Sequence, residues 1–254
     1  MAFSFTAASS HKIEAASVPL TAAPVTVACW FNGTDGCVCS LADTGSDNNY
    51  FELITTTSDN KVTWSSRAGT ETLAQSTTTW TDNVWSHACG IEASATDRRA
   101  FLNGGGKGTD ATSKTPAGID SLGIGFLARA SDADFYQGLI AEVGIWNVAL
   151  TDAEVAVLAA GYSPLCVQPQ SLVFYAPLVR AAQDIRQARA LTVTGASAAN
   201  HPRQFYRTSP QVFMVPSTAT TLVHTLPLMG VGPIGTAGAA AASTPYILFA
   251  GAAA

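Results

Sequence analysis

The most regular pattern of apolar and polar positions in the chain lies between Gly138 and Gly161. The first half of this stretch alternates with the two-residue period of a β-strand. One face of the predicted strand is expected to carry Leu139, Ala141, Val143 and Ile145, and the other Ile140, Glu142, Gly144 and Trp146. The second half predicts a short helix over residues 152–160. Because helical periodicity is scarce elsewhere in the chain, a strand that leads directly into one short helix is a distinctive feature.

Both ends of the predicted helix carry recognisable signals. Thr151 and Glu154 have the spacing of a capping box at its start. Gly161 can adopt the left-handed conformation that ends a helix. Two apolar residues, Val155 and Leu158, lie on one side of the helix and are expected to pack it beside a sheet.

Strand-like runs also recur upstream of this stretch at intervals of about ten residues, which is the spacing typical of an all-β sandwich. Clusters of Gly, Asn, Asp and Ser separate these runs. The Asn103-Gly104 pair predicts a tight hairpin, because both central positions of such a turn need positive φ. The predicted strands cover residues 25–31, 49–54, 61–64, 85–89, 100–104 and 122–125.

Several motifs in these runs, taken in order, resemble the strands of laminin-G-like domains, which belong to the concanavalin-A-like jelly-roll superfamily. They are the Trp that follows small alternating residues in 25–31, the Trp85-x-His87 opening, the aromatic-x-Asn103-Gly104 hairpin, the Leu122-x-Ile-Gly125 strand, and the closing strand with its capped helix. The resemblance covers residues 1–165 and implies an all-β fold, a two-sheet antiparallel jelly-roll sandwich with one short helix. We expect its core to include Trp30, Trp64, Trp85, Phe126, Val143 and Ile145.

A second unit is predicted after Pro164. Its strand-like segments cover residues 171–178 and 191–195, and it closes at 200–203. The motifs resemble an appendage that often follows laminin-G-like domains in proteins encoded by tailed bacteriophages. The residues that carry this resemblance are Leu172, Val173, Tyr175, Pro177, Leu178, 191–196 and 201–203. It implies a small β appendage over 166–209.

The last segment, residues 210–254, has a different composition. From Thr208 to Ala254 the chain contains no Asp, Glu, Lys or Arg, but it has apolar clusters at 212–215, 226–229 and 246–249. Disordered tails are usually charged and poor in large apolar residues. We therefore predict an extended C-terminal arm used in assembly, and the alternative is a low-complexity tail without a role. The candidate anchors of the arm are Phe213, Met214, Leu228 and Phe249.

Composition narrows the classes of partner. Charged residues make up only 12% of the chain, against ~25% in an average soluble domain, which favours a surface covered by other subunits. The net charge of −5 provides no basic footprint, so no nucleic-acid partner is expected. The chain lacks an uninterrupted apolar run long enough to cross a membrane and begins without a signal-peptide pattern.

The five cysteines are predicted to be buried free thiols, which favours synthesis in a reducing compartment. The resemblance to phage proteins implies that this compartment is the cytoplasm of the bacterial host. Their spacing suits neither a zinc ribbon nor a redox motif. Cys37 and Cys39 are expected on the same face of a strand. A Cys29–Cys89 bridge between neighbouring strands stays open as an alternative.

The search for catalytic residues predicts none. Glycosidases of this superfamily carry their two carboxylates in a Glu-x-Asp-x-x-Glu pattern on one strand face, and this motif is absent. Glu142 stands alone on its strand, and Glu52 is flanked by Phe51 and Leu53. His87 is interpreted as a strand residue near the edge of the core. We therefore expect a protein that is not an enzyme.

Two loops and one tryptophan are candidates for binding. One loop carries Asp43, Asp47, Asn48 and Asn49, and the other carries Asp132 and Asp134. Asp and Asn favour turns, so we predict turn chemistry and no cofactor. Calcium, which takes six to eight oxygen ligands, is the alternative for these loops. Trp80 lies among threonines and is the candidate exposed platform for a glycan.

Together these observations predict a non-enzymatic virion structural protein of a tailed bacteriophage, a decoration or cement protein on the capsid surface. Its expected partners are the major capsid protein or other virion proteins and further copies of itself, with a trimer as the expected oligomer. The alternative is a carbohydrate-binding adhesin module of a head or tail fibre, which would bind a host-surface glycan through loops at the rim of the sandwich.

Overall fold

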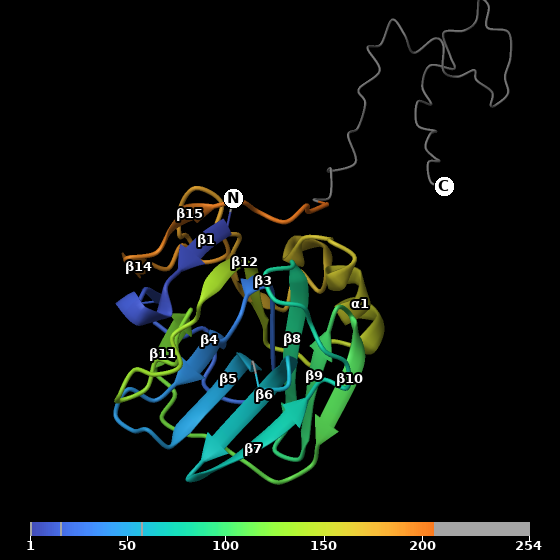
Figure 1. Ribbon diagram of the computed structural model, residues 1–254. Coiled ribbons are helices and arrows are strands. Elements are labelled where there is room, and N and C mark those ends of the chain that lie inside the picture. Colours follow the sequence, from blue (N-terminus) through green and yellow to red (C-terminus); the bar gives the residue numbers. More distant parts are fainter. Residues whose placement is uncertain (1, 16, 57, 206–254) are drawn as a thin grey trace, which may run out of the picture. The chain divides into compact units, whose positions relative to one another are not determined.

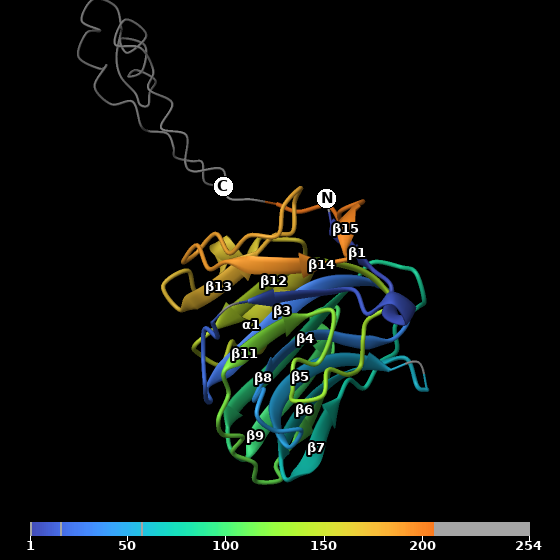
Figure 2. The same ribbon diagram turned by 90° about the vertical axis from the view of Figure 1, so that its left-hand side faces the viewer.

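Two antiparallel sheets, which we name sheet A and sheet B, make up the computed structural model (Figure 1, Figure 2). The structure describes residues 2–15, 17–56 and 58–205, and these belong to one unit, Met1–Tyr206. The predicted all-β sandwich with one short helix is confirmed.

Sheet A has eight strands in the described part of the chain. Their order is β10 (Gly105–Asp110), β9 (Asp97–Leu102), β8 (Ser86–Ser94), β3 (Val25–Gly33), β12 (Gly138–Trp146), β1 (Ala2–Phe5) and β15 (Ser197–Ala199), with β13 (Leu172–Ala176) also pairing with β12. Sheet B has seven described strands, β14 (Leu191–Thr194), β2 (Lys12–Ala15), β11 (Ser121–Ile124), β4 (Gly36–Ala42), β5 (Asn49–Thr56), β6 (Lys61–Ala68) and β7 (Thr70–Gln75).

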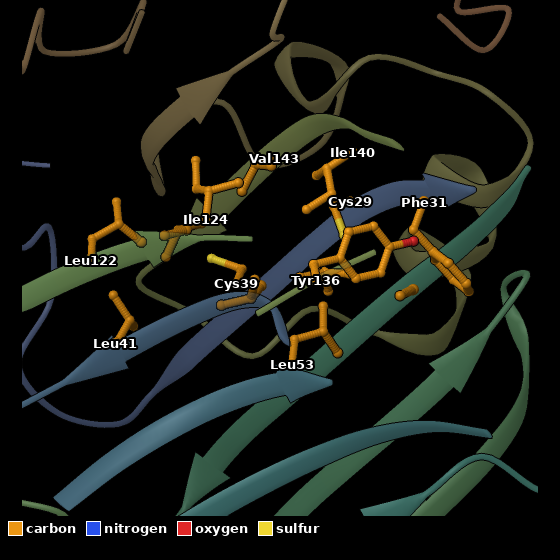
Figure 3. Packing of buried hydrophobic residues seen from close by; sticks show 14 of the residues in the cluster. Cys29, Phe31, Cys39, Leu41, Leu53, Leu122, Ile124, Tyr136, Ile140 and Val143 are labelled. Atoms are coloured by element: carbon orange, nitrogen blue, oxygen red, sulfur yellow. The ribbon is translucent and has the colours of Figure 1, made fainter. Parts of the chain in front are cut away.

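The main core fills the space between the sheets. Figure 3 shows Tyr136 among Cys29, Phe31 and Leu53, which come from β3 and β5. Four of the six predicted core residues are fully buried: Trp64, Phe126, Val143 and Ile145. The prediction was wrong for Trp30 and Trp85, which are half-buried. Trp30 lies between two inward-pointing residues of β3 and therefore points outward, whereas Trp85 precedes β8.

Helix α1 (Asp152–Ala159) packs on the outer face of sheet A, beside β8 (Figure 1). Both hydrogen bonds of the predicted capping box between Thr151 and Glu154 are present, and Gly161 has the predicted positive φ of 94°. The helix is one residue shorter than predicted. Its contact residues form a second cluster with the outer face of the sheet, which includes Ala28, Cys89, Ile91, Phe101, Trp146, Val155 and Leu158.

A β-bulge in β12 overturns the simple alternation predicted for this strand. The register with β3 shifts between Ala141 and Gly144, and Glu142 adopts a left-handed φ of 57°. Because the bulge inserts an extra residue, Ile140 lies in the same inner core as Val143 and Ile145. The predicted set of inward residues was therefore wrong upstream of the bulge.

The predicted appendage is not a separate unit. Its segments 171–178 and 191–195 do form β13 and β14, but β13 pairs with β12 of sheet A and β14 pairs with β2 of sheet B. Strand β15 continues sheet A beside β1 (Figure 2). The predicted boundary at 165/166 was wrong because apolar residues beyond it, such as Val173, pack against the main core. Segment 210–254, with Phe213, Met214, Leu228 and Phe249, lies outside the described residues.

All five cysteines are free thiols, as predicted, and four of them are buried. Cys29 faces the inner core while Cys89 lies in the helix-side cluster, so the alternative bridge between them is not formed. Cys37 and Cys39 do not share a face. A register shift in β4 places Cys39 in the inner core and Cys37 on the outside of sheet B.

One buried ion pair interrupts the apolar space between the sheets. Glu92 of β8 and Arg98 of β9 have side-chain exposures of 1% and 0%. The guanidinium of Arg98 donates to Glu92 Oε1 over 2.9 Å and also bonds Asp110. From sheet B, Trp64 Nε1 and Ser66 Oγ donate to Glu92 Oε2 over 2.9 and 2.6 Å. This Glu92–Arg98 network joins the two sheets through polar contacts.

Candidate functional site

Three side chains on the outer face of sheet B lie in a row across its central strands. Ser40, Glu52 and Ser65 are paired across β4, β5 and β6. Their neighbours Leu41 and Leu53 enter the inner core, so the period of two directs this row away from it. Outward-facing residues of a sandwich are normally solvated, but all three are buried. Something therefore covers this part of the sheet.

The cover is the segment 125–137, which links β11 to β12. Ser40 Oγ donates to Phe126 O over 3.0 Å and accepts from Ala128 N over 3.1 Å. Cys37 N donates to Asp134 O over 2.7 Å. Beneath the segment, a small apolar cluster contains Cys37, Ala42, Tyr50 and Leu127. The segment is thus fixed to sheet B at several points.

Glu52 is a strongly perturbed acidic group under this cover. Its Oε1 atom has no hydrogen-bond partner among the described residues. Burial is the main cause that raises the pKa of Glu52 to about 8, and the negative charges of Asp134 and Glu71 act in the same direction. A hydrogen bond with the Cys37 thiol acts in the opposite direction. At neutral pH this side chain is therefore mostly a carboxylic acid rather than a carboxylate.

Glu71 lies next to this row and is well supplied with donors. Its Oε1 accepts hydrogen bonds from Tyr50 Oη over 2.8 Å and from Ser65 Oγ over 2.7 Å. Burial and the bond to Glu71 raise the pKa of Tyr50. The guanidinium of Arg67 lies 6.0 Å from the centre of the Tyr50 ring. The exposed part of this region therefore combines acidic, basic and hydroxyl groups.

The structure brings together the two acidic loops that the sequence singled out. Ser131 N donates to Asp47 Oδ1 over 2.8 Å, and Arg129 lies 3.5 Å from the same atom. Asp132 pairs with Lys12 at 2.6 Å. Asp43 accepts from Gly45 N over 2.8 Å, which confirms the predicted turn chemistry for this residue.

These contacts occupy carboxylate oxygens that a cation would need as ligands. Among the described residues, no group of three or more His, Cys, Asp or Glu side chains is arranged to hold a metal ion. Calcium prefers six to eight oxygen ligands, whereas Asp47 and Asp132 each face a basic side chain. The loops therefore form a rim closed by ion pairs.

A second polar cluster lies on sheet A, and the sequence did not predict it. Glu142, at the bulge of β12, accepts a hydrogen bond from Tyr175 Oη over 2.5 Å. His201 Nε2 lies 3.0 Å from Glu142 Oε1, and Ser163 Oγ lies 3.1 Å from Tyr175 Oη. Ser163 contacts Tyr175 rather than His201, so these residues do not form the nucleophile–base pair of a hydrolase. They fix segment 200–205 to the sheet.

Two further predictions have definite outcomes. The prediction that the ring of Trp80 is exposed was wrong, because Trp80 is only 4% exposed. Its ring packs edge-on against Phe31, with 5.5 Å between the ring centres. Its polar sequence neighbours did not reveal this contact. His87 is confirmed as a buried strand residue of β8, and burial lowers its pKa to about 3. It is therefore neutral over the physiological range.

Comparisons with known proteins agree with this architecture. Residues 7–156 match the model of a family described as the concanavalin A-like lectin/glucanases superfamily. A comparison with curated proteins finds no match. In the described part of the chain, no helix is both long and apolar enough to cross a membrane.

Two solved structures with TM-scores above 0.5 show the same fold at low sequence identity. A heptameric SAP-like pentraxin from Limulus polyphemus is 15% identical, with a TM-score of 0.57, over 79% of this chain and 94% of its own. A Bacteroides ovatus protein that is provisionally described as carbohydrate-binding is 16% identical, with a TM-score of 0.52. The match covers 80% of this chain and 60% of the other. Tailspike protein 2 of an Escherichia coli O157:H7 bacteriophage is 17% identical, with a TM-score of 0.46. This match covers 64% of this chain and 25% of the tailspike chain.

Proposed function

Since the chain belongs to the concanavalin A-like lectin/glucanases superfamily, whose fold alone does not decide between binding and catalysis, we propose that it is a non-enzymatic structural protein of a tailed-bacteriophage virion. In this proposal it decorates the capsid exterior, where it binds the major capsid protein and other copies of itself. Three kinds of observation support the proposal: the uncharged C-terminal segment, the state of the buried carboxyl groups, and the phage-like motifs.

The observation that carries the proposal is the composition of the last segment. No Asp, Glu, Lys or Arg occurs from Thr208 to Ala254, yet the segment contains Phe213, Met214, Leu228 and Phe249. Apolar side chains gain roughly 25 cal/mol per Å² when they leave water. Among the described residues, the inner core contains apolar side chains from both sheets. The proposed arm therefore gains most from burial against another subunit, with a closed trimer as the expected assembly.

The buried carboxyl groups favour a role without catalysis. Glu92 is held by Arg98, and Glu142 by Tyr175 and His201. Glu52 is covered by segment 125–137. A glycosidase needs two accessible carboxyl groups that flank one bond of the substrate. Glu92 and Glu142 are thus engaged by other side chains, and Glu52 lies beneath a covering segment.

The place of the protein in a virion is supported by its sequence motifs. The segments that resemble a phage appendage include 191–196 and 201–203. In the structure, the first of these supplies β14 of sheet B. Free thiols at all five cysteines agree with synthesis in the reducing cytoplasm of the bacterial host.

Deletion of residues 211–254 tests the proposal. We expect the truncated protein to keep its far-UV circular dichroism and its melting temperature, because the described residues alone provide an inner core with side chains from both sheets. Self-association and attachment to capsids should be lost, as measured by light scattering and by occupancy in electron cryomicroscopy of purified particles. Unchanged occupancy of the truncated protein would contradict the proposed role of the arm.

A further inference from the structure

One segment of the chain forms an edge of both sheets. Strand β14 is the last described strand of sheet B and β15 the last of sheet A, and only residues 195 and 196 separate them (Figure 2). Gly195, with a positive φ of 75°, lies at the bend between the two strands. In the described part of the chain, β14 pairs with β2 on one side and with no strand on the other. This edge of sheet B is therefore open.

Val193 shows that the interior is incompletely covered at this edge. It is paired with Ile13 of β2, and residues directly opposite each other in an antiparallel pair lie on the same face of the sheet. Ile13 is fully buried in the inner core, so Val193 points to the inner side as well. Leu191, two residues earlier, packs against the core, whereas Val193 is 39% exposed. An apolar side chain on the inner face thus lacks part of its cover.

The opposite edges of the two sheets protect each other. Thr77 N, just after β7 of sheet B, donates to Gly106 O of β10 in sheet A over 2.7 Å. Charged side chains, such as Glu71 and Lys107, also lie on these strands. Charges, proline and bulges are the usual means of blunting an edge. Contact and charge therefore make this side a poor place for a further strand.

Strand β14 has none of these protective features. The sequence from Leu191 to Ala199 contains no charged residue and no proline, and β14 pairs with β2 without a register shift. Alternate residues of an edge strand direct their backbone N–H and C=O groups to the free side. Strand β14 can therefore accept a further strand that carries no charge.

The C-terminal segment of this chain contains a sequence that suits the edge. Its first apolar cluster, residues 212–215, reads Val-Phe-Met-Val and has the same length as β14. Val and Phe favour strands, and an uncharged segment avoids the cost of burying a charge.

A second copy is a better acceptor for this cluster than the same chain. Residues 200–205 lead from β15 to the end of α1, where Phe205 N donates to Gly161 O over 2.6 Å (Figure 1). Only residues 206–211 separate Phe205 from the cluster. The chain would have to turn back along this path to reach its own β14, and β14 of a neighbouring copy requires no such reversal.

We propose that residues 212–215 of one copy add a strand to β14 of a second copy. This inference rests on the proposed function, because it names the place where the arm binds. Alternate side chains of the added strand would cover Val193 on the inner face. The same head-to-tail contact, repeated around a ring, would close the expected trimer.

Photo-cross-linking of the full chain tests where the segment binds. Phe213 is replaced by its photoreactive analogue p-benzoylphenylalanine, and the protein is irradiated at a concentration at which it self-associates. We expect mass spectrometry to find cross-links from position 213 to residues 191–194. A denaturing gel should show that the linked species has twice the mass of one chain. Cross-links within single chains, cross-links to other segments, or none would overturn the proposal.

A matched pair of variants measures the contribution of β14. Val193→Lys places a charge on the free edge and should raise the dissociation constant for self-association at least about tenfold, because an ammonium group is costly to bury. Leu73→Lys makes a similar change on β7, where the side chain is 44% exposed, and should change this constant less than about twofold. Analytical ultracentrifugation of the full chains gives both values.

Failure of this inference is distinguishable from failure of the proposed function. If deletion of residues 211–254 abolishes self-association but Val193→Lys leaves it unchanged, the arm binds elsewhere and only the proposal for β14 is overturned. If the deletion leaves self-association unchanged, both are overturned. Because the cross-linked protein keeps β14 unaltered, that experiment remains decisive even if Val193→Lys does not fold.

Discussion

Two glutamates on facing sheets are almost equally buried but have opposite surroundings. Glu92, between the sheets, is 1% exposed and receives hydrogen bonds from Trp64, Ser66 and Arg98. Glu52, on the outer face of sheet B, is 2% exposed, and one of its oxygens has no partner among the described residues. The lesson is that burial alone does not fix the charge of a carboxyl group. Donors arranged around it keep the charge, and without them the group keeps its proton.

The largest expected loss of stability comes from removing Arg98, the cation that pairs with Glu92. Arg98→Ala leaves Glu92 buried without its counter-charge and also frees Asp110. Breaking a buried ion pair on one side typically costs ~3–5 kcal/mol. We expect a loss of this size in the free energy of unfolding measured by urea denaturation at pH 7. A loss below ~1 kcal/mol would mean that the two glutamates differ less than their surroundings indicate.

The second largest expected effect is a pH dependence of the free energy of unfolding that is caused by Glu52. Its pKa is raised from 4.5 to about 8 in the folded protein, so the folded state binds the proton more tightly than the unfolded state. The stability linked to this group is therefore present below pH 4.5 and is lost as pH rises towards 8. Between pH 6.5 and 8 we expect the free energy of unfolding to fall by roughly 1.5 kcal/mol on this account.

Glu52→Gln is the variant that isolates this contribution. Glutamine keeps the shape of the side chain but does not titrate, so the fall between pH 6.5 and 8 should disappear in denaturation curves. Burial lowers the pKa of His87 from 6.5 to about 3, so this group adds a small rise in stability at the lower end of the window, and that rise is the same in the parent protein and the variant. If the variant keeps the slope of the parent protein, another group is responsible and Glu52 is ionised in the folded state.

The smallest effect should come from an ion pair at the surface. Lys107 Nζ lies 3.0 Å from Asp152, but the two side chains are 36% and 58% exposed. Exposed pairs contribute about 0–1 kcal/mol because water screens them. Lys107→Ala should therefore change the free energy of unfolding by less than ~0.5 kcal/mol in urea denaturation. A cost near that of Arg98→Ala would show that burial is not what makes the Glu92–Arg98 pair important.

The features that the sequence predicted correctly depend on neighbours along the chain. The capping box of Thr151 and Glu154 involves residues three positions apart. The hairpin at Asn103-Gly104 depends on two adjacent residues, both of which have the positive φ that this turn requires. Strand positions were predicted well for the same reason, because the two-residue period is a local property.

The features that could not be predicted depend on distant residues or on single insertions. One bulge in β12 moved Ile140 to the inner face, and another in β4 separated Cys37 from Cys39. Trp80 has polar sequence neighbours but is buried by Phe31, which is far away in the chain. The buried candidates Glu52 and Glu92 could be read from the sequence only as isolated acidic residues, because their partners come from other strands.

The position of β1 in sheet A has a consequence for how fast the protein reaches this fold. Strand β1 lies between β12 and β15, so residues 2–5 pair with residues 138–140 and 197–199. Closing such long loops lowers entropy before any pairing energy is gained, and folding rates fall as the sequence separation of contacts grows. On the ribosome, sheet A can be completed only after β15 has emerged. Until then β1, once paired with β12, has an open edge available to other chains, so prompt emergence of the residues up to 199 protects the nascent protein from misassembly.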